Sequence, residues 1–164
     1  MKASVSILRI LGALAAVCLL ANCAVPSAEE VKVFTAADRP IAEELVRDGD
    51  GWSVVCDGPR TCRLFEVQGP AVTQCIALYR AALKSEELHG RAYIEMRCRF
   101  PQRGEFFSKG LDLPVSGTTD WINCQTPFFL RKGMTPDLIK LNLVVEGRGK
   151  VWIKNVGLFK QPES

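Results

Sequence analysis

Three apolar-rich segments in the last third of the chain constrain its fold most strongly. None of them shows the apolar spacing of three to four residues that an amphipathic helix requires, and Gly or Pro residues lie in the connections. Such segments indicate consecutive antiparallel β-strands. They are Trp121–Leu130, Leu138–Glu146 and Val151–Phe159.

The preceding part of the chain contains further segments of the same kind. Successive side chains of a strand point to opposite faces, and alternation in Arg91–Phe100 places Ala92, Ile94 and Met96 on one face and Tyr93, Glu95 and Arg97 on the other. Seven or eight strands separated by turn residues predict an all-β fold, a sandwich of two sheets. The other expected strands are Trp52–Cys56, Cys62–Val67 and Gln74–Lys84.

The N-terminus has the pattern of a secretory signal peptide. Lys2 and Arg9 precede an apolar run, Ile10–Ala21, which is too short for a transmembrane helix of roughly 20 apolar residues. Leu20–Cys23 resembles a bacterial lipobox, in which Cys23 would be acylated, although Asn22 departs from the usual small residue. The alternative is ordinary cleavage near Ala28. We therefore expect an exported protein of the cell envelope or periplasm, attached to a membrane only if Cys23 carries lipid.

We expect one domain behind this signal. Residues 1–23 would be the signal, 24–50 a tether or irregular lead-in, 51–160 the sandwich and 161–164 a tail. The chain carries a formal charge of +3, and losing Lys2 and Arg9 would reduce it to +1. Positively and negatively charged residues are interspersed, so the chain lacks the cluster of basic residues that is typical of a nucleic-acid-binding protein. We expect a monomer.

In an oxidising compartment, an odd number of cysteines leaves at least one thiol free or paired between molecules. Cysteine occurs at positions 18, 23, 56, 62, 75, 98 and 124, so five follow the signal. We expect a disulfide between Cys56 and Cys62, with Cys98 and Cys124 as the next candidate pair and Cys75 as a buried free thiol. No Cys-x-x-Cys occurs, and His89 is the single histidine, so we expect no metal site.

The strand sequences resemble a family of exported bacterial proteins, most of them uncharacterised, in which a galactose-binding-domain-like jelly roll stands behind a signal peptide. The last third also resembles jelly-roll carbohydrate-binding modules. The resemblance spans Trp52–Lys160 and implies a jelly-roll sandwich. Its segments are Leu64–Val67, Tyr79–Lys84, Ala92–Cys98, Gly104–Gly110 and Gly117–Phe159.

The resemblance implies a sugar-binding floor on one sheet. Polar side chains would hold hydroxyl groups through charge-assisted hydrogen bonds, and Tyr93 or Trp152 would stack on the sugar. The alternative is an ordinary solvent face with cross-strand ion pairs. The expected polar row consists of Arg80, Lys84, Glu95, Arg97, Asn142 and Lys154.

Pro101–Thr119 is expected to be a long central loop, and long loops in compact domains are often functional. Phe106, Phe107 and Lys109 could form one wall of a ligand cleft, or one phenylalanine could plug the open end of the sandwich. In some relatives a carboxylate at the position of Lys154 or Asn155 helps to hold calcium. Neither residue here is acidic, so we expect no calcium.

Enzymatic patterns are missing from the sequence. It contains no Gly-x-Ser-x-Gly, His-Glu-x-x-His or P-loop motif. A glycosidase would need two placed carboxylates, and the candidates in or near the central loop are Glu105, Asp112 and Asp120. We therefore expect a non-catalytic binding module without a cofactor, with a glycan as its partner. The second hypothesis is an envelope domain that binds another protein, and the third is a small hydrolase.

Overall fold

The computed structural model describes residues 27–163, which form eight strands. No helix in this range is long and apolar enough to cross a membrane. The strands are β1 (Glu29–Val33), β2 (Val46–Asp48), β3 (Gly51–Cys56), β4 (Arg60–Gln68), β5 (Cys75–Phe100), β6 (Gly104–Lys109), β7 (Val115–Leu130) and β8 (Leu138–Gln161).

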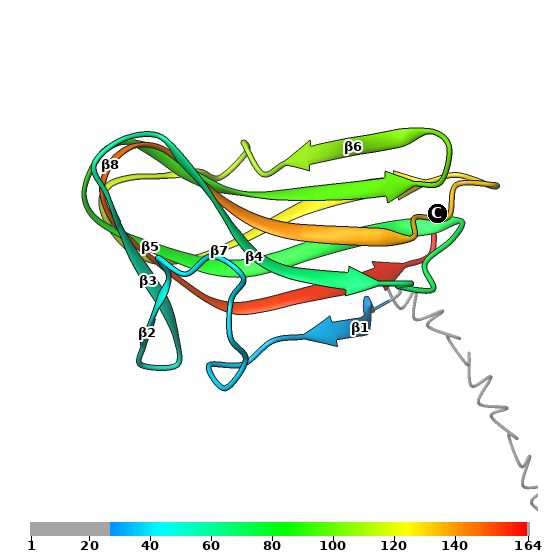
Figure 1. Ribbon diagram of the computed structural model, residues 1–164, viewed down its shortest axis with the longest axis horizontal. Coiled ribbons are helices and arrows are strands. Elements are labelled where there is room, and N and C mark those ends of the chain that lie inside the picture. The colour runs from blue at the N-terminus through cyan, green and yellow to red at the C-terminus, as the bar shows by residue number, and fades with distance from the viewer. Residues whose placement is uncertain (1–26, 164) are drawn as a thin grey trace, which may run out of the picture.

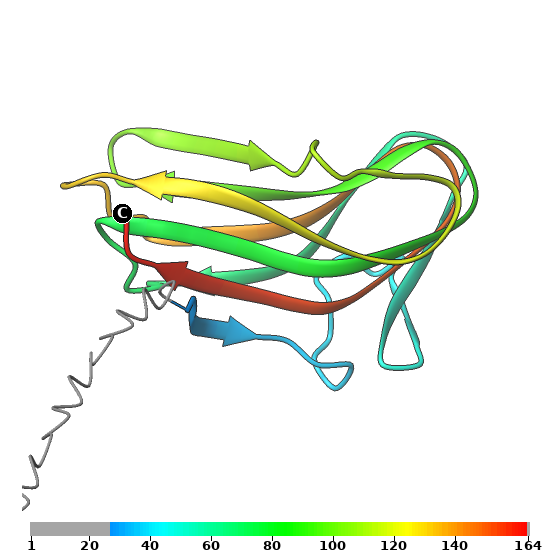
Figure 2. The ribbon, with the colours of Figure 1, turned by 180° about the vertical axis from the view of Figure 1, so that it is seen from behind.

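The long strands β5 and β8 bend, and each therefore contributes to both layers of a sandwich (Figure 1). The layer nearer the viewer in Figure 1, here the front sheet, has the order β6, second half of β5, first half of β8, β4. The rear sheet, seen in front in Figure 2, has the order β7, first half of β5, second half of β8. Strands β1 and β3 pair with the free edge of β8 in the rear sheet, and β2 pairs with β3. The predicted two-sheet jelly roll is confirmed.

Glycines allow the two long strands to bend together. Gly90 of β5 lies opposite Gly147 of β8, with φ values of +122° and +156°. A Cβ atom on Gly90 would lie 2.0 Å from the carbonyl oxygen of Glu146, and one on Gly147 would lie 2.0 Å from that of His89. Only glycine permits this backbone conformation and this close approach.

The core lies between the sheets and is formed by the apolar rows that alternation predicts. The front sheet contributes Ile94 and Met96 from β5 and Leu141 and Leu143 from β8, all fully buried. At roughly 1.5–3 kcal/mol for each large apolar side chain that is buried, such rows provide most of the stabilisation.

The segment expected to be a tether contributes to the sandwich instead. From Glu29 onward it forms β1 and β2, and Phe34 is buried with its ring stacked on Phe65 at 3.9 Å between centroids. The charged residues on the exposed side of β1 concealed this short strand in the sequence. The expected signal peptide and Cys23 lie outside the described residues.

The expected loop between Pro101 and Thr119 is mostly strand. It contains β6, which pairs with the end of β5, and the beginning of β7. Phe106 and Phe107 are 49% and 60% exposed, so this edge strand lacks the alternating burial that would have revealed it. Phe106 packs edge-on against Phe100, with 5.8 Å between ring centroids.

The expected disulfide between Cys56 and Cys62 does not form. All five cysteines within residues 27–163 are buried free thiols, Cys98 and Cys124 included. Cys56 ends β3 in the rear sheet, opposite Gly149, whereas Cys62 lies on β4 in the front sheet, opposite Leu143. The two strands therefore belong to different sheets and do not form the hairpin that the prediction assumed.

Candidate functional site

Polar side chains from four strands gather on the outer face of the front sheet, and we call this surface the front site. Strand β5 places Glu95 between Asn142 of β8 and Lys109 of β6. Two positions along, Arg97 lies between Lys140 and Phe107. The core-facing residues between them hold the strands in register, so sheet pairing fixes the positions of all these side chains.

Glu95 is buried although it points away from the core, with only 2% of the residue exposed. Its Oε1 accepts hydrogen bonds from Nε of Arg97 at 2.6 Å and from Nδ2 of Asn142 at 3.2 Å. The ammonium group of Lys109 lies 3.9 Å from Oε2, beyond hydrogen-bonding distance. A buried carboxylate requires such partners, and Arg97 and Asn142 supply them to Oε1.

Arg97 links Glu95 to a second carboxylate. Its Nη1 lies 3.3 Å from Oε1 of Glu105, whose Oε2 accepts a hydrogen bond from Lys140 at 2.5 Å. The hydrogen bond from Lys140, with Arg97 beside it, holds the pKa of Glu105 below its usual value. The hydrogen bond to Glu95 raises the pKa of Arg97. These side chains therefore form one network with alternating charges.

Tyr93 belongs to this network through its hydroxyl group and does not offer its ring to solvent. The residue is 1% exposed, and its hydroxyl donates to Oε1 of Glu146 at 2.8 Å while Arg91 donates to Oε2 at 2.6 Å. Burial, and then the hydrogen bond to Glu146, raises the pKa of Tyr93 to about 12. Phe107, 60% exposed, is instead the aromatic ring accessible at this site.

Two hollows lie along the front site. One, of about 340 Å³, is lined by Tyr93, Glu95 and Lys109. The other, of about 540 Å³, is lined by Glu105, Lys140 and Asn142. Both include Arg97 and Thr61, so they adjoin.

The segment before β2 forms one wall of the larger hollow. Ile41 and Ala42 line it, and their amide groups donate to the carbonyl groups of Leu64 and Arg63 at 2.9 and 2.8 Å. The hollow therefore has a fixed side wall as well as a sheet floor.

The polar row predicted from the sequence is divided between the two sheets. Glu95, Arg97 and Asn142 meet at the front site, with Phe107 and Lys109 beside them. The remaining predicted residues, Arg80, Lys84, Trp152 and Lys154, lie on the outer face of the rear sheet. The bends in β5 and β8 cause this division, because residues on either side of a bend enter different layers.

Trp152 has partners of its own on the rear sheet. Its indole Nε1 donates to Asp48 at 2.8 Å, and the ammonium groups of Lys150 and Lys84 lie 4.2 and 5.2 Å from the centre of its ring system. These contacts connect β8 to β2 and cover the ring. Trp152 therefore lies on the other sheet, away from Glu95 and Arg97.

The carboxylates considered for hydrolysis do not converge. Glu105 belongs to the front network, Asp112 lines a pocket at the rear sheet, and Asp120 accepts a hydrogen bond from the amide of Trp121 at 2.8 Å. No cluster of His, Cys, Asp or Glu within residues 27–163 is arranged to hold a metal ion. Lys154 donates to Asp50 at 3.0 Å, and the expected lack of calcium binding stays a prediction.

Comparison with known proteins identifies the fold. No protein-family model and no curated protein matches the sequence. Among solved structures, the CBM22-1 xylan-binding domain of Paenibacillus barcinonensis Xyn10C superposes with a TM-score of 0.55 and 7% identity over 86% of this chain and 100% of that domain. A single-residue mutant of the module CBM29-2, in complex with mannohexaose, gives a TM-score of 0.51 and 11% identity over 84% of this chain and 93% of the module.

The CBM22-1 and GH10 modules of Clostridium thermocellum Xyn10B, solved with xylohexaose, give a TM-score of 0.56 and 8% identity over 81% of this chain. This chain spans only 29% of that two-module chain. Identities this low show a common fold and nothing finer. The protein is therefore a β-sandwich similar in fold to carbohydrate-binding modules.

Proposed function

We propose that this protein is a non-catalytic carbohydrate-binding module of the cell envelope that holds a glycan on the front site. The buried Glu95, fixed by Arg97 and Asn142 on the outer face of a sheet, is the observation that carries the proposal. An ordinary solvent face would leave such a carboxylate exposed and hydrated. Here the charged groups are held in place before a ligand arrives, which lowers the entropic cost of binding.

The chemistry of the site suits hydroxyl groups. Carboxylate, guanidinium and amide groups provide both acceptors and donors, and charge-assisted hydrogen bonds are about twice as strong as neutral ones. Phe107 provides an exposed apolar surface at the edge of the same site, as required for the apolar face of a sugar ring. The structural neighbours include modules solved with xylohexaose and mannohexaose, which makes these the first ligands to test.

The envelope location rests on the secretory pattern of residues 1–23 and on the lipobox-like Leu20–Cys23. Acylation of Cys23 together with additional acyl chains would hold the domain at a membrane stably, whereas a single chain would not. Metabolic labelling with a palmitate analogue, compared between the native chain and Cys23→Ala, tests this part of the proposal. Labelling that persists in Cys23→Ala would overturn it.

Affinity electrophoresis in gels containing xylan or glucomannan tests the front site. We expect the native protein to be retarded in at least one gel and Phe107→Ala to lose about tenfold in affinity, or roughly 1.4 kcal/mol. Phe129→Ala is a matched control, because Phe129 is 54% exposed but lies on the rear sheet, whereas Phe107 lies opposite Arg97 on the front sheet. Equal retardation of Phe107→Ala and the native protein would contradict binding at the front site.

The exposed Phe106 and Phe107 on the edge strand β6 favour protein docking as a second candidate function. A strand at the edge of a sheet has unpaired backbone groups that another chain can use. A folded protein that binds no glycan but co-purifies with one envelope protein in fixed proportion, and loses that partner in Phe106→Ser, would support this alternative.

A further inference from the structure

We propose that the outer face of the rear sheet contains a second glycan-binding groove, so that one molecule can hold two glycan chains on opposite faces. Two hollows, of about 580 and 700 Å³, lie on this face and share Asn155 and Phe159 in their linings. The first extends from these residues to Gln125 of β7, and the second extends to Val33 of β1. Together they cross the sheet from β7 to β1, which suits an extended chain better than a small molecule.

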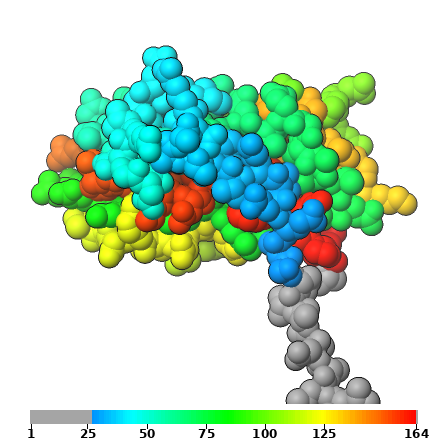
Figure 3. Space-filling view, turned by 90° about the horizontal axis from the view of Figure 1, so that it is seen from below, coloured from blue at the N-terminus to red at the C-terminus, as the bar shows by residue number. Residues whose placement is uncertain are grey.

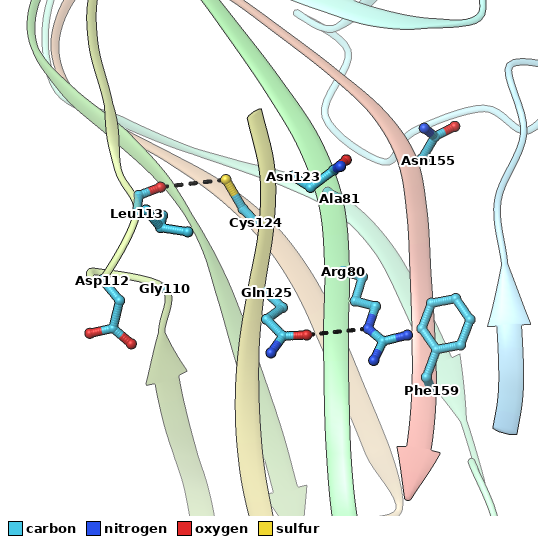
Figure 4. A pocket seen from close by; sticks show the side chains of 10 residues that line it. All are labelled: Arg80, Ala81, Gly110, Asp112, Leu113, Asn123, Cys124, Gln125, Asn155 and Phe159. Atoms are coloured by element: carbon cyan, nitrogen blue, oxygen red, sulfur yellow. Dashed lines mark hydrogen bonds between the residues drawn. The ribbon is translucent and has the colours of Figure 1, made fainter. Parts of the chain in front are cut away.

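Phe159 provides a flat apolar surface in the middle of this groove. The residue at 157 is glycine, and a Cβ atom there would lie 2.8 Å from the Phe159 ring. The ring can therefore lie against the strand itself. In Figure 4, which looks onto the rear sheet, the ring is seen face-on. The side chain is half-buried, and the part of the ring left open to the groove can contact the apolar face of a sugar.

Asn155 is directed into the groove by an irregularity in β8. The pairing of β5 with β8 shifts between Arg80 and Ala82, where Arg80 is opposite Gly157 and Ala82 is opposite Lys154. Between these two pairs β8 has one residue more than β5. Asn155 lies there, is exposed, and has a φ of +53°. A bulge of this kind redirects a side chain, and asparagine tolerates the left-handed conformation better than most residues.

Further polar groups surround the ring. The Arg80 guanidinium lies 5.0 Å from the centre of the Phe159 ring and donates to Oε1 of Gln125 at 3.3 Å. Asn123 and Asn155 form no hydrogen bond with the other residues drawn in Figure 4. Their amide groups are thus available as both donors and acceptors.

These features favour a neutral glycan over other polymers. Each hollow is lined by one carboxylate and one guanidinium group, Asp112 with Arg80 in the first and Asp50 with Arg47 in the second, so the groove has no excess charge of either sign for a charged polymer. An extended peptide would need free backbone groups, but β5 and β8 are paired on both sides where they form the floor. A hydroxyl-rich chain needs only the ring, the amides and the guanidinium group.

Figure 3 shows the sandwich from its side, so that the two outer faces are seen in profile. Because the front site and the rear groove lie on opposite sheets, two glycan chains could bind without touching one another. The rear groove stands on its own observations, whereas the bridging of two chains also rests on the proposed function of the front site.

Isothermal titration with xylohexaose and with mannohexaose, on protein purified from the complete chain, tests the inference. We expect two hexasaccharides per chain for the native protein. Asn155→Gly, which also relieves the positive φ, and Phe159→Ala should each reduce the number to one. Gln74→Gly is the matched control for the first variant, because Gln74 is also exposed with a φ of +48° but does not line the groove. Phe129→Ala is the control for the second.

The outcomes separate the two sites. A stoichiometry of one that is lost in Phe107→Ala and unchanged in Asn155→Gly and Phe159→Ala would overturn the rear groove and leave the front site standing. A stoichiometry of one that is lost in Asn155→Gly and Phe159→Ala but kept in Phe107→Ala would support the rear groove and remove the front site. No heat with either sugar, from protein whose thermal unfolding is cooperative, would overturn both.

Discussion

Arg97 donates a hydrogen bond to Glu95 at 2.6 Å on the outer face of the front sheet, yet Glu95 is as inaccessible as a core residue, at 2% exposure. A buried carboxylate without partners is strongly destabilising. The pair, with Asn142 as a third member, is therefore part of what holds β5 and β8 together as well as the centre of the candidate site.

Glu95→Gln should lower the stability of the protein without large structural change. The amide preserves the shape of the side chain but removes the charge that Arg97 and Lys109 face. Hydrogen bonds to charged groups contribute about 1.5–3 kcal/mol to stability. Because the Arg97 side chain is 42% exposed and water screens its charge, we expect the free energy of unfolding to fall by an amount near the lower end of this range. Urea unfolding measures it, with the exposed Glu43→Gln as control. Equal unfolding midpoints for both variants would contradict the role given to Glu95.

Gly90→Ala should be among the most damaging single substitutions in the chain. The new methyl group would lie 2.0 Å from a backbone oxygen, at a φ of +122°. We expect a loss of at least about 3 kcal/mol or failure to fold. Gly58→Ala is the control, because a Cβ there meets nothing within 4 Å, and it should change stability by less than about 1 kcal/mol. Comparable unfolding curves for the two variants would show that the bend does not depend on Gly90.

Acid should destabilise the protein through its paired carboxylates. Lys140 and Arg97 lower the pKa of Glu105 in the folded state, and Arg91 and Tyr93 lower that of Glu146. As the pH falls, the unfolded chain therefore takes up protons on these two carboxylates before the folded protein does, near the ordinary glutamate pKa of 4.5. The stabilisation is present above that pH and is lost as the pH falls through the folded-state values.

Urea midpoints measured between pH 7 and pH 3 test this dependence. Glu105→Gln should flatten the decline below pH 5 relative to the native protein. A decline of the same steepness in Glu105→Gln and in the native protein would contradict the assignment to Glu105.

All five cysteines of the described domain should be free in the native protein. Burial raises the pKa of the Cys62 and Cys98 thiols to about 12, so both should react slowly with alkylating agents at neutral pH. Alkylation in denaturant without a reducing agent, followed by mass spectrometry, should label every one of them. Labelling of Cys56 and Cys62 only after reduction would restore the disulfide that the sequence suggested.

The sequence predicted the local features of the fold well. Alternation is a property of a single strand, and so the inner row around Met96 and the outer row of Tyr93, Glu95 and Arg97 were both found. Strand neighbours depend on contacts between distant segments. The bend at Gly90 and Gly147 could not be read from alternation, and this is why Arg80 and Trp152 were placed on the wrong sheet.

The rear groove left one local signal in the sequence that was not used. Lys154 and Asn155 are adjacent polar residues in a strand that otherwise alternates, which is typical of a β-bulge. No sequence pattern indicated that Tyr93 and Glu95 would be buried on an outer face. It results from the neighbours that the tertiary fold provides, so alternation could predict the position of Tyr93 but not that its ring is covered.

We propose above that this sandwich binds glycans through its outer faces. A glycan array probed with the native protein and with the double variant Phe107→Ala/Phe159→Ala tests it, because Phe107 and Phe159 are the rings assigned to the front site and to the rear groove. We predict reproducible binding to neutral oligosaccharides by the native protein and loss of that binding in a double variant that still unfolds cooperatively. A blank array with folded native protein, or binding that survives in the double variant, would contradict it.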